Sequence, residues 1–190
     1  ASTRAHRSLL IMDEIPTGLG KTGRFFAHDH DDISPDMIVL GKALGGGVLP
    51  IAAVVVRADL DVAGDFAIGH YTHEKNPVTA RAALTTLDII EDEGLCDRAE
   101  RLGAAAMDRL RDSLVGLSCV KDIRGRGLMF GVEIDTADRA ERILYSCVAE
   151  GLSFKISAGN VLTLSPPLTI PEPDLASALS IVETAVKDAA

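Results

Sequence analysis

The chain has 190 residues, of which 47% are hydrophobic, and a formal net charge of -9 at pH 7. This length suffices for one domain or two small ones with a sizeable core, and the 19 scattered Lys and Arg residues exclude nucleic acid as an expected partner. No apolar stretch approaches the length needed to span a bilayer, and no charged-then-apolar leader is present, so we expect a cytoplasmic protein without membrane contact.

The three cysteines, Cys96, Cys119 and Cys147, are odd in number and far apart in the sequence. Neither a disulfide framework nor a metal site has this spacing. We therefore expect reduced, structural thiols.

Short apolar runs predict three buried strands of the kind found in parallel sheets, at residues 9–12, 37–40 and 51–56. Asp13 follows the first run, and Lys42 stands just beyond the second. Ligands of open α/β sheets bind at the carboxyl ends of strands, where a lysine partly withdrawn from water can act as an amine nucleophile. A carboxylate at the end of a buried strand needs a cationic partner.

Lys42 and Asp13 together indicate a pyridoxal phosphate site. In such sites a lysine forms a Schiff base with the cofactor, and an aspartate pairs with the protonated pyridine nitrogen. The sequence therefore predicts Lys42 as the catalytic residue and Asp13 as a cofactor-binding residue.

Beyond this region, apolar residues at three- and four-residue intervals predict helices at about 77–94 and 97–117, after a short helix at best at 58–63. The last third predicts strand, strand, helix, strand, strand, helix, at residues 119–123, 128–134, 137–150, 152–156, 161–164 and 172–189. We expect an α/β part over residues 1–95, and a long helix with a small α+β domain over 96–190.

Several segments carry a family resemblance. Asp13–Gly23 with Phe26-Ala27 resembles the D-E-V-Q-T-G-x-G-R-T-G-x-x-F-A signature of class III aminotransferases, and further matches occur in order at Thr72–Pro77, Arg124–Leu128 and Ser165–Leu168. The resemblance implies the C-terminal portion of a fold type I enzyme dependent on pyridoxal phosphate. That portion comprises part of the large, mainly parallel-sheet domain and a small α+β domain.

The resemblance also implies roles for individual residues. Lys42 would form the Schiff base and act as general base, Asp13 would bind the ring nitrogen, and Ile15 would pack on the ring face. Thr72 would bind the cofactor phosphate across the interface of a homodimer, although it could instead cap the helix that starts near Pro77. The implied activity is transfer of an amino group between an amine or amino acid and a keto acid.

Three departures from the family pattern bear on the substrate, and one of them is Glu74-Lys75 in place of the small residues that the family usually has before Asn76-Pro77. Pro16 stands where the family usually has a glutamine, and Thr163 stands where amino acid transaminases of this class often have an arginine that grips the substrate carboxylate. Arg126 and Lys155 are alternative candidates for holding an anion. A class III lyase that eliminates ammonia or phosphate from an amino alcohol phosphate or phosphonate is therefore the alternative function.

Other interpretations have less support. Residues 18–23 satisfy G-x-G-x-x-G after a strand, but the long helix that a dinucleotide site needs does not follow. His28 and His30, with acidic neighbours, could hold a metal, yet alternating loop residues without a further cluster are more often solvated, so we expect no metal site. A catalytically silent remnant of the fold is the third alternative.

Overall fold

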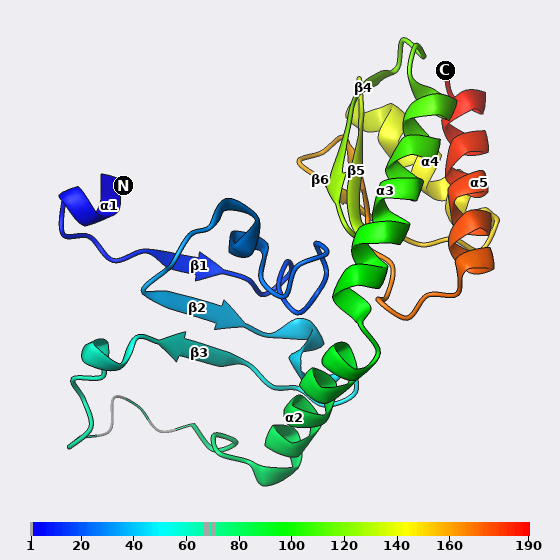
Figure 1. The fold of residues 1–190 in the computed structure, drawn as a ribbon. Helices are drawn as coiled ribbons and strands as arrows, with labels where there is room; N and C mark the ends of the chain where they lie inside the picture. Colours follow the sequence, from blue (N-terminus) through cyan, green and yellow to red (C-terminus); the bar gives the residue numbers. More distant parts are fainter. Residues whose placement is uncertain (1, 67–68, 70) are drawn as a thin grey trace. The chain divides into compact units, whose positions relative to one another are not determined.

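The computed structural model describes residues 2–66, 69 and 71–190, whose contacts divide the chain into two units (Figure 1). The first unit comprises the residues up to Gly20 together with Arg24–Gly94. The second comprises Leu95–Ala190 together with Lys21–Gly23. Each unit is built around its own sheet.

The first unit contains a three-stranded sheet in the order β1-β2-β3. Strand β1 (Ile11–Asp13) pairs in parallel with β2 (Met37–Leu40), and β2 pairs in antiparallel fashion with β3 (Ala53–Val56). The remaining elements of the unit are helices: α1 (Ser2–Ala5), η1 (Ala27–Asp31), η2 (Lys42–Gly45), η3 (Ala58–Leu60) and α2 (Pro77–Asp92). The predicted strands are confirmed as strands, in a mixed sheet.

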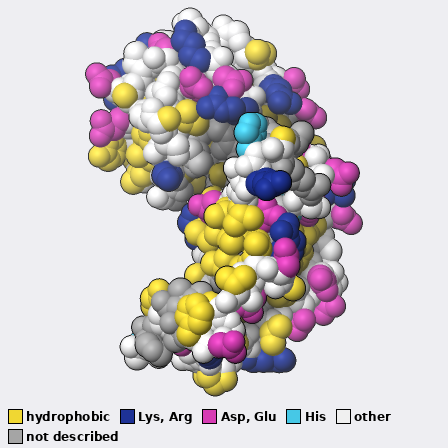
Figure 2. All heavy atoms as spheres, turned by 90° about the vertical axis from the view of Figure 1, so that its left-hand side faces the viewer, with side chains coloured by type: hydrophobic (Ala, Val, Ile, Leu, Met, Phe, Trp, Pro, Cys, Tyr) yellow, Lys and Arg dark blue, Asp and Glu magenta, His cyan; other side chains and the backbone are white. Residues whose placement is uncertain are grey.

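The prediction that these strands are buried is wrong for most of their side chains. Leu40 is buried, but Ile11 and Val54 are 55% and 59% exposed. Exposed hydrophobic side chains are visible as yellow patches in Figure 2. An apolar run shows which side chains favour burial without showing which segment covers them, and exposed apolar strands are typical of surfaces that other protein covers.

Helix α2 begins and ends close to its predicted limits. Asn76 Oδ1 accepts hydrogen bonds from the first turn of the helix, Pro77 occupies the first helical position, and Gly94 lies just beyond the end with a φ of 59°. The helix packs on η2. A Cβ built on Gly46 would lie 3.1 Å from Thr86 Oγ1, so α2 closely supports the segment that follows Lys42.

The second unit contains a four-stranded antiparallel sheet in the order β4-β5-β7-β6. Its strands are β4 (Val120–Arg126), β5 (Met129–Ile134), β6 (Lys155–Ser157) and β7 (Val161–Leu164). Helices α3 (Leu95–Leu114), α4 (Ala137–Ala149) and α5 (Glu172–Asp188) cover one face of the sheet (Figure 1). The predicted α+β pattern is confirmed.

The core of this unit forms between the sheet and its helices. Alternate residues of β5 point inward, and Phe130, Val132 and Ile134 are almost fully buried. They pack with apolar residues of the three helices, such as Leu110 and Ile143. The opposite face of the sheet is polar and carries the candidate substrate residues. Packing of the core holds the strands that carry them in position.

The cysteines form no disulfide in the described part of the chain. Cys119 and Cys147 are buried in the core of the second unit. Burial raises the pKa of the Cys147 thiol to about 11, so this thiol stays protonated and unreactive at neutral pH.

Candidate active site

Asp13 and Lys42 follow neighbouring parallel strands. Asp13 is the last residue of β1 and pairs in register with Val39 of β2, while Lys42 comes two residues after β2 ends. Because the carboxyl ends of parallel strands meet at one edge of a sheet, both side chains belong to the same edge.

The Asp13 carboxylate is exposed, and its Oδ1 accepts a hydrogen bond of 3.0 Å from the backbone N–H of Ile15. No described cation forms an ion pair with it, so the predicted cationic partner is not found. The physical reason is its exposure, since a carboxylate in water needs no partner.

Lys42 has an unusual backbone conformation. It is the first residue of η2, its side chain is exposed, and its φ is 44°, in the left-handed region that non-glycine residues rarely adopt. Such a conformation costs about 1–3 kcal/mol and occurs often at functional sites. Lys42 also lines an open hollow of about 670 Å³ together with residues 47–52.

Ile15 lies against the peptide that precedes Lys42. It is half-buried, and a Cβ built on Gly41 would lie 3.6 Å from Ile15 Cγ2. The structure therefore brings Asp13, Ile15 and Lys42 to one region of the first unit.

A buried carboxylate stands directly behind Asp13. Glu14 is 2% exposed, and its two oxygens accept hydrogen bonds from Thr17 Oγ1 at 2.5 Å, Ala27 N at 3.1 Å and His28 N at 3.0 Å. The imidazole Nδ1 of His28 lies 3.0 Å from Glu14 Oε1. These bonds join the end of β1 to the glycine-rich loop and to η1.

The pKa of Glu14 reflects two opposing effects. Burial alone raises the pKa of this carboxyl group, but the hydrogen bonds from Thr17, Ala27 and His28 together outweigh burial and hold the pKa below its ordinary value. Glu14 is therefore ionised at neutral pH and ties the backbone that follows Asp13 to the start of η1.

His28, the buried member of the His28 and His30 pair, binds Glu14 and so belongs to this hydrogen-bond network. Among the described residues, no group of three or more His, Cys, Asp or Glu side chains is placed to hold a metal ion. Within the same part of the chain, no helix is long and apolar enough to cross a membrane.

Thr72 lies near the start of α2. It is exposed and lines a second hollow, of about 690 Å³, with Asn76 and Thr79 of the helix start. The alternative in which Thr72 caps the helix is wrong, because Asn76 Oδ1 accepts from Val78 N at 2.9 Å and from Thr79 N at 3.5 Å. Residues 50–52 line both hollows, so the Thr72 hollow adjoins the Lys42 hollow.

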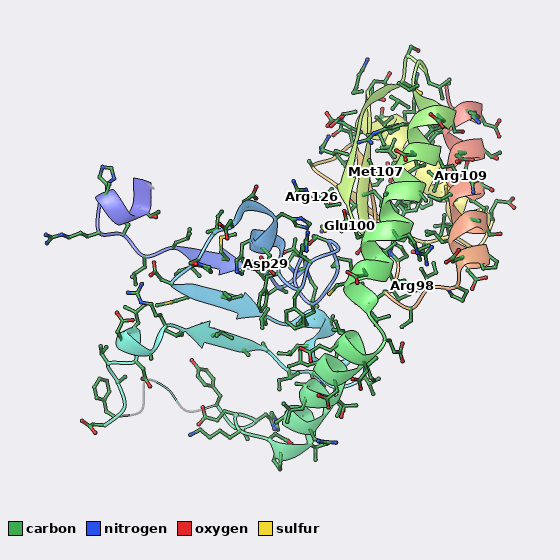
Figure 3. All side chains as sticks on the ribbon, viewed as in Figure 1. Asp29, Arg98, Glu100, Met107, Arg109 and Arg126 are labelled. Carbon is green, nitrogen blue, oxygen red and sulfur yellow. The ribbon has the colours of Figure 1, made fainter. Side chains whose placement is uncertain are left out.

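The candidate substrate residues all belong to the second unit. Thr163 and Lys155 are directly opposite each other on β7 and β6, and Thr163 Oγ1 donates to Ser157 Oγ at 2.9 Å. Arg126 ends β4 and pairs with Met129 (Figure 3). The structure thus brings Thr163 and Lys155 together and places Arg126 on a different strand, at the far edge of the sheet.

Three features were missed by sequence reasoning. The Asn76-Pro77 pair is a recognisable helix start, so the cap could have been identified. A structural role for Glu14 could have been suspected from its position after Asp13, but its partners Ala27 and His28 could not have been predicted. The left-handed backbone of Lys42 has no sequence signal, because Lys rarely adopts it.

The sequence model of the family described as "Aminotransferase class-III" matches residues 1–186 of this chain. Among curated relatives, the (R)-1-hydroxy-2-aminoethylphosphonate ammonia-lyase of Vibrio splendidus is 43% identical over 95% of this chain and 40% of that protein. The leucine/methionine racemase of Thermococcus litoralis is 41% identical, over 96% of this chain and 43% of that protein.

A solved structure with a similar fold is the ornithine aminotransferase of Toxoplasma gondii, which is described with partial occupancy of PLP at its active site. It has a TM-score of 0.91 and 39% identity, and the match covers 98% of this chain and 44% of that one. The predicted α/β fold of pyridoxal-phosphate-dependent transferases is thereby confirmed. This chain spans less than half the length of these three proteins. It belongs to the class-III aminotransferase family.

Proposed function

We propose that the protein containing this chain is a pyridoxal-phosphate-dependent aminotransferase, with Lys42 as its catalytic amine. It would move an amino group between an amine or amino acid and a keto acid. The observation that carries this proposal is the parallel pairing of β1 with β2, which assigns Asp13 and Lys42 to one sheet edge. The strained backbone of Lys42 supports it further.

The chemistry of these residues suits pyridoxal phosphate. Asp13 offers an exposed carboxylate for a protonated ring nitrogen, Ile15 offers an apolar surface for a flat ring, and Lys42 offers an amine for an aldehyde. Thr72 offers a hydroxyl beside the amino end of α2, and helix amino ends favour anions such as phosphate. When bound, pyridoxal phosphate supplies an aldehyde that condenses with amines and a ring that accepts electrons.

Each residue has a distinct task in this proposal. Lys42 would hold the cofactor through Nζ, and its free amine would act as the general base that moves the proton from the substrate carbon to the cofactor. Asp13 holds the proton at the ring nitrogen. Glu14, through its bonds to Thr17 and η1, keeps the backbone around Asp13 in place.

A lyase is the second candidate function. Its support is the 43% identity to a protein named as an ammonia-lyase of an aminoethylphosphonate, combined with the hydroxyl of Thr163 on the substrate side. A screen of amino acids, amines and aminoethylphosphonates separates the candidates. Transfer yields a new amino acid from an added keto acid, whereas elimination releases ammonia or phosphate without an acceptor.

Replacement of Lys42 tests the proposal. Lys42→Ala removes both the nucleophile and the general base, so turnover is expected to fall by at least about a thousandfold. The matched control is Lys121→Ala, which removes an exposed lysine whose Nζ donates to Ser118 O. The control is expected to keep wild-type turnover, and normal turnover of Lys42→Ala would reject the assignment.

The resemblance supports further proposals about the whole protein. We propose a cytoplasmic homodimer in which Thr72 of one subunit binds the phosphate held by the other. Thr163, Arg126 and Lys155 are proposed substrate contacts. Residues 1–95 and 96–190 are proposed as parts of two domains, and sedimentation analysis of the intact protein checks the dimer.

A further inference from the structure

The loop between β7 and α5, residues 165–171, is held by side chains that bind its carbonyl groups. It contains Pro166, Pro167 and Pro171, which lack a backbone N–H and cannot pair as a strand. Within the loop, Ile170 N donates to Pro167 O at 3.1 Å. Three of its carbonyl groups are instead bound by cationic side chains.

Lys21 binds the first of these carbonyls. Its Nζ donates to Pro166 O at 2.6 Å, across 145 residues of sequence. Burial lowers the pKa of Lys21, so an ammonium is kept here at an energetic cost while its described acceptor is a neutral carbonyl. Among the described residues, Lys21 forms no ion pair with a carboxylate, so its side-chain partner is the Pro166 carbonyl of the loop.

The backbone of Lys21 is itself held in the second unit. Leu128 N donates to Lys21 O at 2.9 Å. A Cβ built on Gly127 would lie only 2.5 Å from Thr22 C, so the two backbones are in direct contact. The backbone of Lys21 is therefore held in place while its side chain binds Pro166 O.

Arg98 binds the other two carbonyls. This residue of α3, which Figure 3 labels, donates through Nη1 to Leu168 O and through Nη2 to Ile170 O. The planar guanidinium fork can hold two carbonyls in a fixed relative position, which a single ammonium cannot do.

We propose that Lys21 and Arg98 are positioning residues for substrate binding. They hold residues 165–170 and so fix the end of β7, where Thr163 lies two residues before the loop. Thr163 is the candidate substrate contact, so this inference rests on the proposed function. It links the glycine-rich signature around Lys21 to the Ser165–Leu168 signature through one hydrogen bond.

The test combines kinetics with amide hydrogen exchange on the intact, cofactor-loaded protein. Lys21→Met and Arg98→Lys are each expected to raise KM for the amino donor about tenfold while kcat stays within about twofold of wild type, because a charged hydrogen bond to the loop is lost but Lys42 is not touched. Lys21→Arg, which can still donate to Pro166 O, is expected to restore KM. Amide exchange at Ile170, whose N–H donates to Pro167 O, is expected to accelerate about tenfold in the first two variants.

Arg101→Met is the matched control. It changes a residue on the same helix as Arg98 and removes an exposed ion pair of 2.9 Å with the Glu172 side chain, rather than a bond to a loop carbonyl. It is expected to leave KM and exchange unchanged.

An unchanged KM in Lys21→Met and Arg98→Lys overturns the positioning role. So does a fall in kcat as large as the rise in KM, if both follow the loss of folding stability. If the wild-type protein turns over no amine, the proposed function has failed instead. Unchanged exchange at Ile170 would then show, independently of any activity, that Lys21 and Arg98 do not hold the loop in place.

Discussion

His28 Nδ1 lies 3.0 Å from Glu14 Oε1, and the backbone N–H of His28 donates to the same oxygen. One residue thus binds a buried carboxylate twice, next to the proposed cofactor ligand Asp13. The pairing explains why an acidic residue is tolerated at a buried position at the end of β1. The proposed site therefore depends on Glu14 and His28, although neither residue has a role in the proposed reaction.

Glu14→Gln is expected to destabilise the protein by about 2–4 kcal/mol. The amide would place an NH₂ group among donors that now meet a carboxylate, which leaves buried groups unpaired. Urea unfolding measures the change. Glu172→Gln, which loses only an exposed ion pair, serves as control and is expected to change stability by less than about 1 kcal/mol; equal effects of the two changes would contradict the account.

The lowered pKa of Glu14 predicts a loss of stability in acid. Its pKa is lower in the folded than in the unfolded chain, so its stabilising contribution is complete above the ordinary value of 4.5 and is lost as pH falls through the folded-state pKa. Unfolding free energies of wild type and Glu14→Gln should therefore converge as pH falls from about 6 to about 3. A constant difference over that range would show that the charge of Glu14 is irrelevant.

Gly127→Ala is expected to cost about 2–4 kcal/mol of stability. Its φ is 51°, and a Cβ would meet the backbone of Thr22 and Gly23 at 2.5 and 2.6 Å, so a conformational penalty is added to a steric one. Gly116→Ala isolates the conformational part, because its φ is 93° and a Cβ there meets nothing within 4 Å. Thermal unfolding should rank Gly127→Ala well below Gly116→Ala, and equal melting temperatures would refute the close approach.

Asn76→Asp tests the anion site at the start of α2. Aspartate caps a helix as well as asparagine does, so stability should be unchanged. The added negative charge should weaken binding of pyridoxal phosphate about two- to fivefold, since it repels an anion near the helix amino end. Val115→Asp, at an exposed position of the second unit, adds the same charge as a control, and unchanged cofactor affinity of Asn76→Asp would argue against phosphate at Thr72.

Local patterns predicted much of the fold, because helices depend on nearby residues. The run from Pro77 toward Gly94 appears as α2 (Pro77–Asp92), and the predicted helix at 97–117 appears as α3 (Leu95–Leu114). The strands were also found, but the exposure of Val54 was not. Burial depends on which segments cover a strand, and that information is not in the strand itself.

The candidate site was predictable only in part. Asp13 and Lys42 stand out because each follows an apolar run, and the structure puts both at one sheet edge. The bond from Lys21 to Pro166 spans 145 residues and follows no periodicity, so no local pattern could indicate it.

Covalent trapping shows directly whether Lys42 carries the cofactor. The intact protein is loaded with pyridoxal phosphate, reduced with borohydride, digested and mapped by mass spectrometry. A phosphopyridoxyl group is expected on Lys42 and none on the control residue Lys121. Label on another lysine, or an unlabelled Lys42, would contradict this assignment.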